Sequence, residues 1–333
     1  MNLLSVQKIG EALGAEITGL DLAQPIAADV FAQIRAAWLE HLVLRFRGQK
    51  LSDPQVLAFS RNFGELDPPG PNPLGRPFLA DHPEMNVISN IKEGGVPIGG
   101  LGDGEAIWHA DMTYVERPPM AAILYAIELP PAGGDTYWAN MYAAYESLPA
   151  ALKERIEGRE AVHDATYNSA GVMRKGYKDV TDPRTAPGAR HPLVRTHPET
   201  GRRSLFLGRR RNSYVVGLEL DESEALLDEL WRHATQPQFT FRQQWRGRRA
   251  GVGQPLHPAP PRRLRSAGAP APPPYADQSC VIIARSRSMR RRLTAKSRRP
   301  RREAERTWIT LPSWKNSTSS TKPRSLLRTS AYK

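Results

Sequence analysis

The chain has 333 residues, 40% of them hydrophobic, with a single cysteine, Cys280, and a formal net charge of +13. This length suits one large domain or two ordinary ones, and one cysteine excludes an internal disulfide and a cysteine-based zinc site. The longest apolar run, Met120 to Ile127, is too short to span a bilayer. Charged residues follow the N-terminus too closely for a secretory signal, so we expect a cytoplasmic protein.

The positive charge is confined to the last quarter of the chain. Residues 247–333 contain 21 Lys and Arg but 3 acidic residues, a net +18, whereas residues 1–246 hold 26 basic and 31 acidic residues, a net −5. The tail also holds 11 prolines and loses all apolar periodicity, which is typical of disorder. We therefore predict an acidic, enzyme-like domain over 1–246 and a disordered basic tail over 247–333.

The predicted elements alternate between short strands and amphipathic helices. Residues 3–21 alternate as strand and turn, and a helix that Asp29 caps precedes a buried strand over 41–46. Ser52 caps a second helix, which Gly64 ends. The remaining predicted elements are a strand over 85–89, a glycine-rich loop over 94–104, a helix within 137–158, strands over 192–196 and 204–207, a helix from Asp221, and a strand over 239–245. Short strands with helices outside them favour a mixed, mainly antiparallel β core over a doubly wound sheet.

Two residues directly after the glycine-rich loop carry the first chemical signal. His109 and Asp111 lie in the sequence Trp-His-Ala-Asp, and on a strand they would point to the same face. One imidazole and one carboxylate form two thirds of the facial triad of non-haem Fe(II) oxygenases. Alone, this spacing is a weak signal, and a surface histidine beside a solvated aspartate is the alternative. The glycine-rich loop lacks the context of a phosphate-binding loop.

The segment around this motif resembles a known family. The stretch WHADMTYVERPPMAAILYAIELPPAGGDTYWANMYAAYESLP is similar to the core of the taurine and 2,4-dichlorophenoxyacetate (TauD/TfdA) dioxygenase family. The stretches GAEITGLDL, HLVLRFRGQ and HPLVRTHPETGRRSLFLG resemble it as well, so that the resemblance covers almost all of residues 1–246. It implies a double-stranded β-helix, or jelly roll, flanked by helices and mainly β with α.

The resemblance also implies an activity and a set of site residues. It implies an oxidoreductase, a dioxygenase that hydroxylates a small, anionic organic substrate with Fe(II), 2-oxoglutarate and O2 and releases succinate and CO2. It implies His109 and Asp111 as iron ligands and Thr136 as a hydrogen-bond donor to 2-oxoglutarate. An ordinary strand threonine is the alternative for Thr136. The expected partner is then a small-molecule substrate, and we expect binding neither to a membrane nor to a specific nucleic acid. A homo-oligomer is an open alternative to a monomer.

Two expected parts of the family pattern are missing. The family places a second histidine ligand and a 2-oxoglutarate-binding arginine late in the chain, after a segment that reads W-D-N-R. Here the corresponding stretch after Arg246 reads GRRAGVGQPLHPAP. Read one base out of register, the codons of residues 247–262 can encode GDVLVWDNRCTLHRRD, which places the expected histidine under Ala259. We therefore hypothesise a frame shift near Arg246, which leaves the jelly roll without its C-terminal strands.

Five further histidines and two other functions are alternatives to this interpretation. His257 lies near the expected ligand position, but its proline neighbours disfavour a strand, so we do not assign it to the metal. For His163, His191, His197 and His233 we expect loop or surface positions. The alternative functions are a catalytically inactive, frame-shifted remnant of the enzyme and nonspecific polyanion binding by the basic tail.

Overall fold

The computed structural model describes residues 4–67, 75–101, 107–129, 134–208, 211–245 and 279–284, and only the backbone is described for 279–284, Pro97 and Leu101. Contacts within the chain divide it into the units Met1–Arg290 and Arg291–Lys333, and every described residue belongs to the first unit. No helix among these residues is long and apolar enough to cross a membrane.

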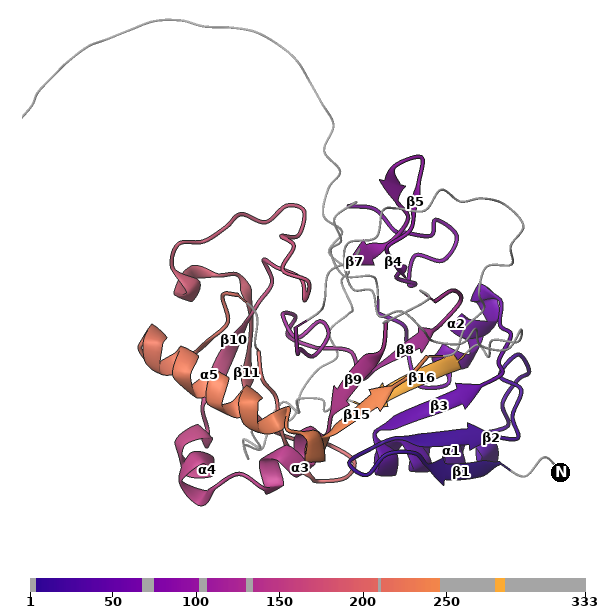
Figure 1. Cartoon of the computed structure of the whole chain (residues 1–333), viewed down its shortest axis with the longest axis horizontal. Helices are drawn as coiled ribbons and strands as arrows, with labels where there is room; N and C mark the ends of the chain where they lie inside the picture. Colours follow the sequence, from indigo (N-terminus) through magenta and orange to yellow (C-terminus); the bar gives the residue numbers. More distant parts are fainter. Residues whose placement is uncertain are drawn as a thin grey trace, which may run out of the picture. The chain divides into compact units, whose positions relative to one another are not determined.

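A five-stranded sheet carries the N-terminal part of the chain (Figure 1). Its order is β1–β2–β3–β16–β8, and its strands are β1 (Ser5–Lys8), β2 (Ala15–Thr18), β3 (Val43–Arg47), β8 (Ala121–Tyr125) and β16 (Ser279–Ala284). The first hairpin is antiparallel and β2 pairs parallel to β3. Strand β16 pairs antiparallel to β3 on one side and to β8 on the other. This strand comes from the tail for which composition predicts no regular structure.

Two helices cover one face of this sheet, α1 (Ala28–His41) and α2 (Asp53–Arg61). They bury a core of aromatic rings in which Trp38 and Phe63 meet edge to face at 5.4 Å. The cap predicted at Ser52 is confirmed, because it forms a capping box with Gln55. The cap predicted at Asp29 is wrong: Ala27 is the N-cap residue, and Asp29 lies in the first turn, where a carboxylate is still favourable.

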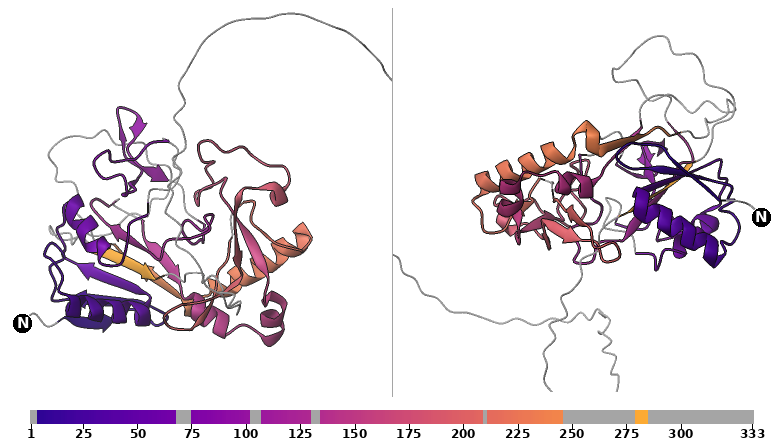
Figure 2. Two further views of the ribbon diagram at one scale, coloured as in Figure 1. Left: turned by 180° about the vertical axis from the view of Figure 1, so that it is seen from behind. Right: turned by 90° about the horizontal axis from the view of Figure 1, so that it is seen from below.

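A second group of strands and helices follows in the sequence. The strands are β10 (Glu160–Asp164), β11 (Gly188–Pro192) and β14 (Tyr214–Val215) in one sheet, and β12 (Val194–Thr196) and β13 (Arg203–Leu205) in a hairpin. The helices are α3 (Met141–Glu146), α4 (Ala150–Ile156) and α5 (Leu220–Ala234), with 3-10 turns η1 (Pro183–Thr185) and η2 (Pro237–Phe239). Helix α5 lies on one side of this group of elements (Figures 1 and 2), contacts β14 and buries Leu226, Leu227 and Leu230.

The helix predicted within 137–158 is divided in two. Helix α3 ends before Pro149 and α4 starts after it, because a proline disfavours helical backbone in the residue before it. The start of that range is strand β9 (Thr136–Ala139), which pairs antiparallel with β15 (Thr240–Gln243). Trp138 stacks on Phe241 across this pair, and both join a core that includes Val43 of the large sheet.

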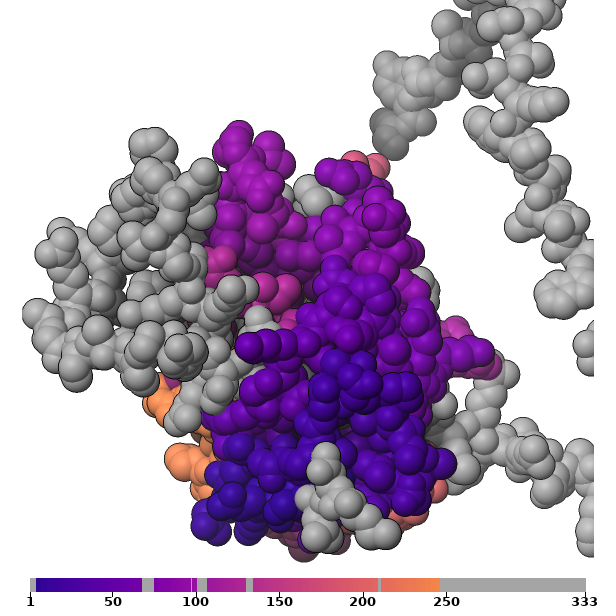
Figure 3. Space-filling view, turned by 90° about the vertical axis from the view of Figure 1, so that its right-hand side faces the viewer, coloured from indigo at the N-terminus to yellow at the C-terminus, as the bar shows by residue number. Residues whose placement is uncertain are grey.

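The remaining strands are two residues long. They are β4 (Ile88–Ser89), β5 (Lys92–Glu93), β6 (Val96–Pro97) and β7 (Gly100–Leu101). The strand predicted over 85–89 is therefore reduced to β4, and the glycine-rich loop contains β6 and β7, while residues 102–104 lie outside the described residues. In the space-filling view, the N-terminal part in indigo and violet forms most of the coloured surface (Figure 3).

The architecture is a mixed α/β arrangement with several small sheets. This agrees with the predicted mixed, mainly antiparallel β core, since β2–β3 and β4–β7 are the parallel pairs among the described strands. The closed double-stranded β-helix stays a prediction.

Candidate functional site

The predicted ligand pair lies in a turn and not on a strand. Residues 107–110 have irregular backbone and a turn begins at Asp111, followed by Met112 with a left-handed φ of 49°. The expectation that strand alternation aligns His109 and Asp111 is therefore wrong. The turn nevertheless brings the two side chains into direct contact.

The hydrogen bonds of His109 define what its ring can do. Its Nδ1 lies 2.7 Å from the carbonyl oxygen of Ile107, and its Nε2 lies 3.0 Å from Oδ1 of Asp111. A carbonyl can only accept, so Nδ1 carries a proton, and in the neutral ring Nε2 is then a lone pair. A lone pair and a carboxylate oxygen that face each other at this distance repel unless a proton or a metal ion lies between or beside them.

This donor set suits a divalent metal. A backbone carbonyl that holds Nδ1–H and frees Nε2 is the usual outer contact of a metal-binding histidine. Ligands on adjacent corners of an octahedron with bonds of about 2.1 Å lie about 3.0 Å apart, as the two facing atoms do here. The pair is accessible, since the side chains are 23% and 46% exposed.

A complete set of protein ligands is not present in the part of the chain described. Among those residues, no group of three His, Cys, Asp or Glu side chains is placed to hold a metal ion. The position at which the family pattern expects its second histidine, Ala259, lies outside the described residues, as does His257. Of the three ligands that the family pattern predicts, the described residues thus contain the two candidates His109 and Asp111.

Thr136 lies at the start of β9, opposite Gln243 of β15. Its hydroxyl oxygen accepts a hydrogen bond of 2.8 Å from the indole Nε1–H of Trp245. Because this bond uses a lone pair, the hydroxyl hydrogen stays available to donate to a ligand. Gln243 is fully buried and accepts a bond from Arg45, which also pairs with Glu16. Trp245 is a candidate functional residue that the sequence pattern did not indicate.

Of the four histidines expected in loops or at the surface, three are buried, and the expectation is wrong for the two that lie on strands, His163 and His191. His163 lies on β10 and His191 on β11, with 0% and 2% exposure, and His197 is 4% exposed. His191 Nε2 lies 2.8 Å from the carbonyl oxygen of Thr113 and 3.0 Å from that of Val115. It thus fastens the segment that follows Asp111. His233, on α5, contacts Ser147.

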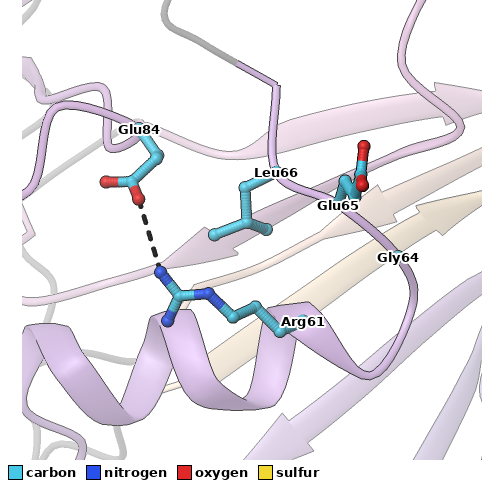
Figure 4. Close-up of a pocket in the computed structure, with 5 residues that line it drawn as sticks. All are labelled: Arg61, Gly64, Glu65, Leu66 and Glu84. Atoms are coloured by element: carbon cyan, nitrogen blue, oxygen red, sulfur yellow. Dashed lines mark hydrogen bonds and ion pairs between the residues drawn. The ribbon is translucent and has the colours of Figure 1, made fainter.

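Two surface pockets among the described residues differ in whether they adjoin the ligand turn. The larger, of about 810 Å³, is lined by Tyr114, Val115 and Glu116 and by residues 187–192 of β11 and its approach. It therefore adjoins the segment that carries the ligand pair. The smaller, of about 400 Å³, lies at the end of α2, where Arg61 and Glu84 form an ion pair at 3.3 Å (Figure 4). It shares no residue with the ligand segment.

Comparison with known proteins identifies the class. Residues 5–247 match the family described as taurine catabolism dioxygenase TauD, TfdA family. The chain belongs to this family, whose enzymes are oxidoreductases that depend on Fe(II) and 2-oxoglutarate and use O2.

Particular relatives support the assignment. An alpha-ketoglutarate-dependent 2,4-dichlorophenoxyacetate dioxygenase of Cupriavidus pinatubonensis is 35% identical over 239 residues, which span 69% of this chain and 82% of that protein. An alpha-ketoglutarate-dependent sulfate ester dioxygenase of Pseudomonas putida is 34% identical over 250 residues, 73% of this chain and 78% of the relative.

Solved structures agree in fold. The crystal structure of a taurine dioxygenase from Burkholderia xenovorans has a TM-score of 0.58 and 32% identity, covering 84% of this chain and 80% of that one. The structure of AAD-2 in complex with Mn(II) and N-oxalylglycine has a TM-score of 0.60 and 25% identity, covering 85% and 88% of the two chains.

Proposed function

We propose that this chain has the architecture of an Fe(II)- and 2-oxoglutarate-dependent dioxygenase that hydroxylates a small anionic compound, and that it contains two of the iron ligands. His109 and Asp111 would hold the iron, and Thr136 would donate a hydrogen bond to 2-oxoglutarate. The observation that carries the proposal is the contact of His109 Nε2 with Asp111 Oδ1, with Nδ1 held by the carbonyl of Ile107.

The metal, when bound, supplies an open coordination face for co-substrate and oxygen. His109 and Asp111 would hold the metal, and their neighbours would orient these two side chains. The Ile107 carbonyl fixes the tautomer of His109, and the His191 bonds to Thr113 and Val115 fasten the turn behind Asp111. Trp245 restrains the hydroxyl of Thr136. Such restraint keeps the side chains in place when the metal arrives.

The class of substrate is inferred from the relatives. Their names specify an aryloxyacetate and a sulfate ester, both small organic molecules with an anionic group. We infer the same class of substrate, a small organic anion, for the present chain. A cytoplasmic location and a homo-oligomer stay predictions of the same proposal.

Metal binding and turnover test the proposal separately. Mn(II) binding to the purified chain, followed by calorimetry, is expected to weaken at least tenfold in His109→Ala, because one of two ligands is lost. Succinate release with Fe(II), 2-oxoglutarate and a panel of aryloxyacetates and sulfate esters is expected to disappear in the same variant. His82→Ala is the matched control, since it removes a histidine outside this turn. Equal Mn(II) affinity in wild type and His109→Ala would contradict the proposal.

An inactive remnant is the second candidate, and one observation favours it. The family match stops at residue 247, next to the point where the charge and the expected pattern change. In this case the chain binds Mn(II) through His109 and Asp111 but releases no succinate with any substrate. The nucleotide sequence of codons 240–262 decides the origin: an intact frame, shared with related genes, would eliminate the frame-shift hypothesis.

A further inference from the structure

A tight loop, residues 164–174, follows strand β10 and closes on itself. Tyr167 and Met173 form an antiparallel bridge, and the backbone N–H of Arg174 donates to the carbonyl oxygen of Thr166 at 2.8 Å. The two ends of the 164–174 loop are therefore held side by side, as in a short hairpin.

The side chain of Arg174 closes this loop a second time. The residue is 7% exposed, and its Nη1 donates to the carbonyl oxygens of Ala165 at 2.7 Å and Tyr167 at 2.9 Å. With the backbone bond to Thr166, Arg174 thus serves three consecutive carbonyl groups. Because hydrogen bonds from a charged donor are stronger than those between neutral groups, the guanidinium contributes strongly to closing the loop.

The loop holds the ligand turn, residues 107–114, at both of its ends. Before the ligand pair, the N–H of Ile107 donates to the carbonyl oxygen of Ser169 in the loop at 3.0 Å. After the pair, the guanidinium of Arg174 lies over the ring of Tyr114, 4.1 Å from the ring centre, within the range of a cation–π contact. A single loop therefore restrains the chain on either side of the pair.

Ile107 links the loop to the side chain of His109. The N–H of Ile107 is engaged by Ser169, and its carbonyl oxygen lies 2.7 Å from Nδ1 of His109. That carbonyl holds the ring proton on Nδ1 and leaves the lone pair of Nε2 toward Asp111. A displacement of the loop therefore moves Ile107 and, with it, the acceptor that orients the His109 ring.

We infer that Arg174 is a positioning residue for the metal site. By closing the 164–174 loop, it fixes Ile107 and thereby the orientation of the His109 ring. The inference rests on the proposed function, in which His109 is a metal ligand. Groups that orient a metal ligand from outside typically change metal affinity by roughly 10–100-fold when they are replaced. Since Arg174 acts through intervening residues, we expect an effect at the lower end of this range.

The first readout uses the full chain without metal. Hydrogen exchange at the Ile107 amide is expected to be faster by roughly tenfold or more in Arg174→Met, because the loop that accepts this N–H is loosened. The amide of Leu227 in α5 is expected to exchange as in the wild type. Leu230→Ala, which removes a buried side chain from α5, should show the reverse pattern, with faster exchange at Leu227 and unchanged exchange at Ile107.

The second readout is the affinity for Mn(II), measured by calorimetry. Arg174→Met is expected to weaken binding about tenfold, and Arg174→Lys should regain part of the loss, since an ammonium keeps the charge and donors but lacks the planar guanidinium. Leu230→Ala should bind as the wild type does, which separates positioning from a general loss of stability. If Arg174→Met does not fold, Arg174→Lys replaces it in both readouts, with a smaller effect expected.

Two results would overturn the inference. One is Ile107 exchange in the Arg174 variant equal to that of the wild type, and the other is faster exchange combined with wild-type Mn(II) affinity. In both cases the wild type binds Mn(II) and loses affinity in His109→Ala, so that the proposed function stands. A wild type that binds no Mn(II) would instead contradict the proposed function, and with it the role of Arg174 at the metal site.

Discussion

At the scale of single residues, the buried His191 makes the free energy of unfolding depend on pH. His191 is buried, and burial, with the nearby Arg195 as a smaller cause, lowers its pKa below the usual value. Its Nε2 lies within hydrogen-bond distance of two carbonyl oxygens. The neutral ring can donate its one N–H to both of them. The residue thus contributes to stability in its neutral form.

The sign of the pH effect follows from this lowered pKa. The unfolded chain takes up the proton at about pH 6.5, before the folded chain does, so stability is full above that pH and declines as the pH falls toward the folded pKa. We expect the free energy of unfolding, measured in urea, to fall as the pH drops below about 6.5, the pKa of a histidine in an unfolded chain. In His191→Gln this decline should be smaller, whereas His82→Gln should leave it unchanged. The same decline in all three proteins would assign the effect to other groups.

The hydroxyl of Thr136 permits a second test at this scale. Loss of one hydrogen bond to a charged ligand costs about 1.5–3 kcal/mol, so Thr136→Val should weaken binding of N-oxalylglycine in the presence of Mn(II) by roughly tenfold or more. Thr240→Val is the matched control on the paired strand, because that hydroxyl donates to the carbonyl of Pro237. Calorimetry measures both, and equal weakening in the two variants would indicate damage to the β9–β15 pair.

At the scale of elements, strand β16 has the largest consequence for the large sheet. It fills the position between β3 and β8, with hydrogen-bonded neighbours on both sides. Proline in its centre removes a donor from the ladder. We expect Ile282→Pro to lower the free energy of unfolding by roughly 2–4 kcal/mol.

The control for this substitution lies on the edge of the same sheet. Ser5→Pro places proline at the first residue of β1, which has one neighbouring strand and where proline is tolerated. Chemical unfolding of the full chain compares the two. A cost for Ile282→Pro no larger than that for Ser5→Pro would show that β16 does not support the sheet.

The sequence predicted the elements whose signals are local. The capping box at Ser52 and the apolar faces of α1, α2 and α5 depend on neighbouring residues, and the structure places these helices accordingly. Strand β16 could not be predicted, since its short apolar run lies between proline-rich and arginine-rich stretches and is selected by two distant partners. Strand alternation was the wrong basis for placing His109 beside Asp111, because a turn that the two-residue spacing does not specify brings their side chains into contact. The burial of His163 and His191 depends on strand pairing that a single sequence does not specify.

At the scale of the whole molecule, charge separates the two parts of the chain. Residues 1–246 carry −5 and residues 247–333 carry +18. The tail should therefore bind polyanions without specificity and with strong dependence on salt.

Neutralising part of the tail tests this expectation. Replacement of Arg290, Arg291 and Arg292 by glutamine should reduce the slope of log K against log salt for DNA binding by about 2–3. Replacement of three exposed body arginines, Arg155, Arg184 and Arg203, should leave the slope unchanged. An equal change in both proteins, measured by fluorescence anisotropy, would show that the body takes part in binding.

The place of β16 in the sheet also sets an order of events during synthesis. Its partner β8 ends at Tyr125, whereas β16 starts at Ser279, so the ribosome adds about 150 residues between them, which takes roughly 8–30 s at about 5–20 residues per second. Throughout that interval β3 and β8 each lack a neighbour, and unpaired strand edges favour association with other chains. The nascent chain is thus most exposed to aggregation and to chaperones before its final quarter emerges, and a premature stop anywhere before residue 284 would make that exposure permanent.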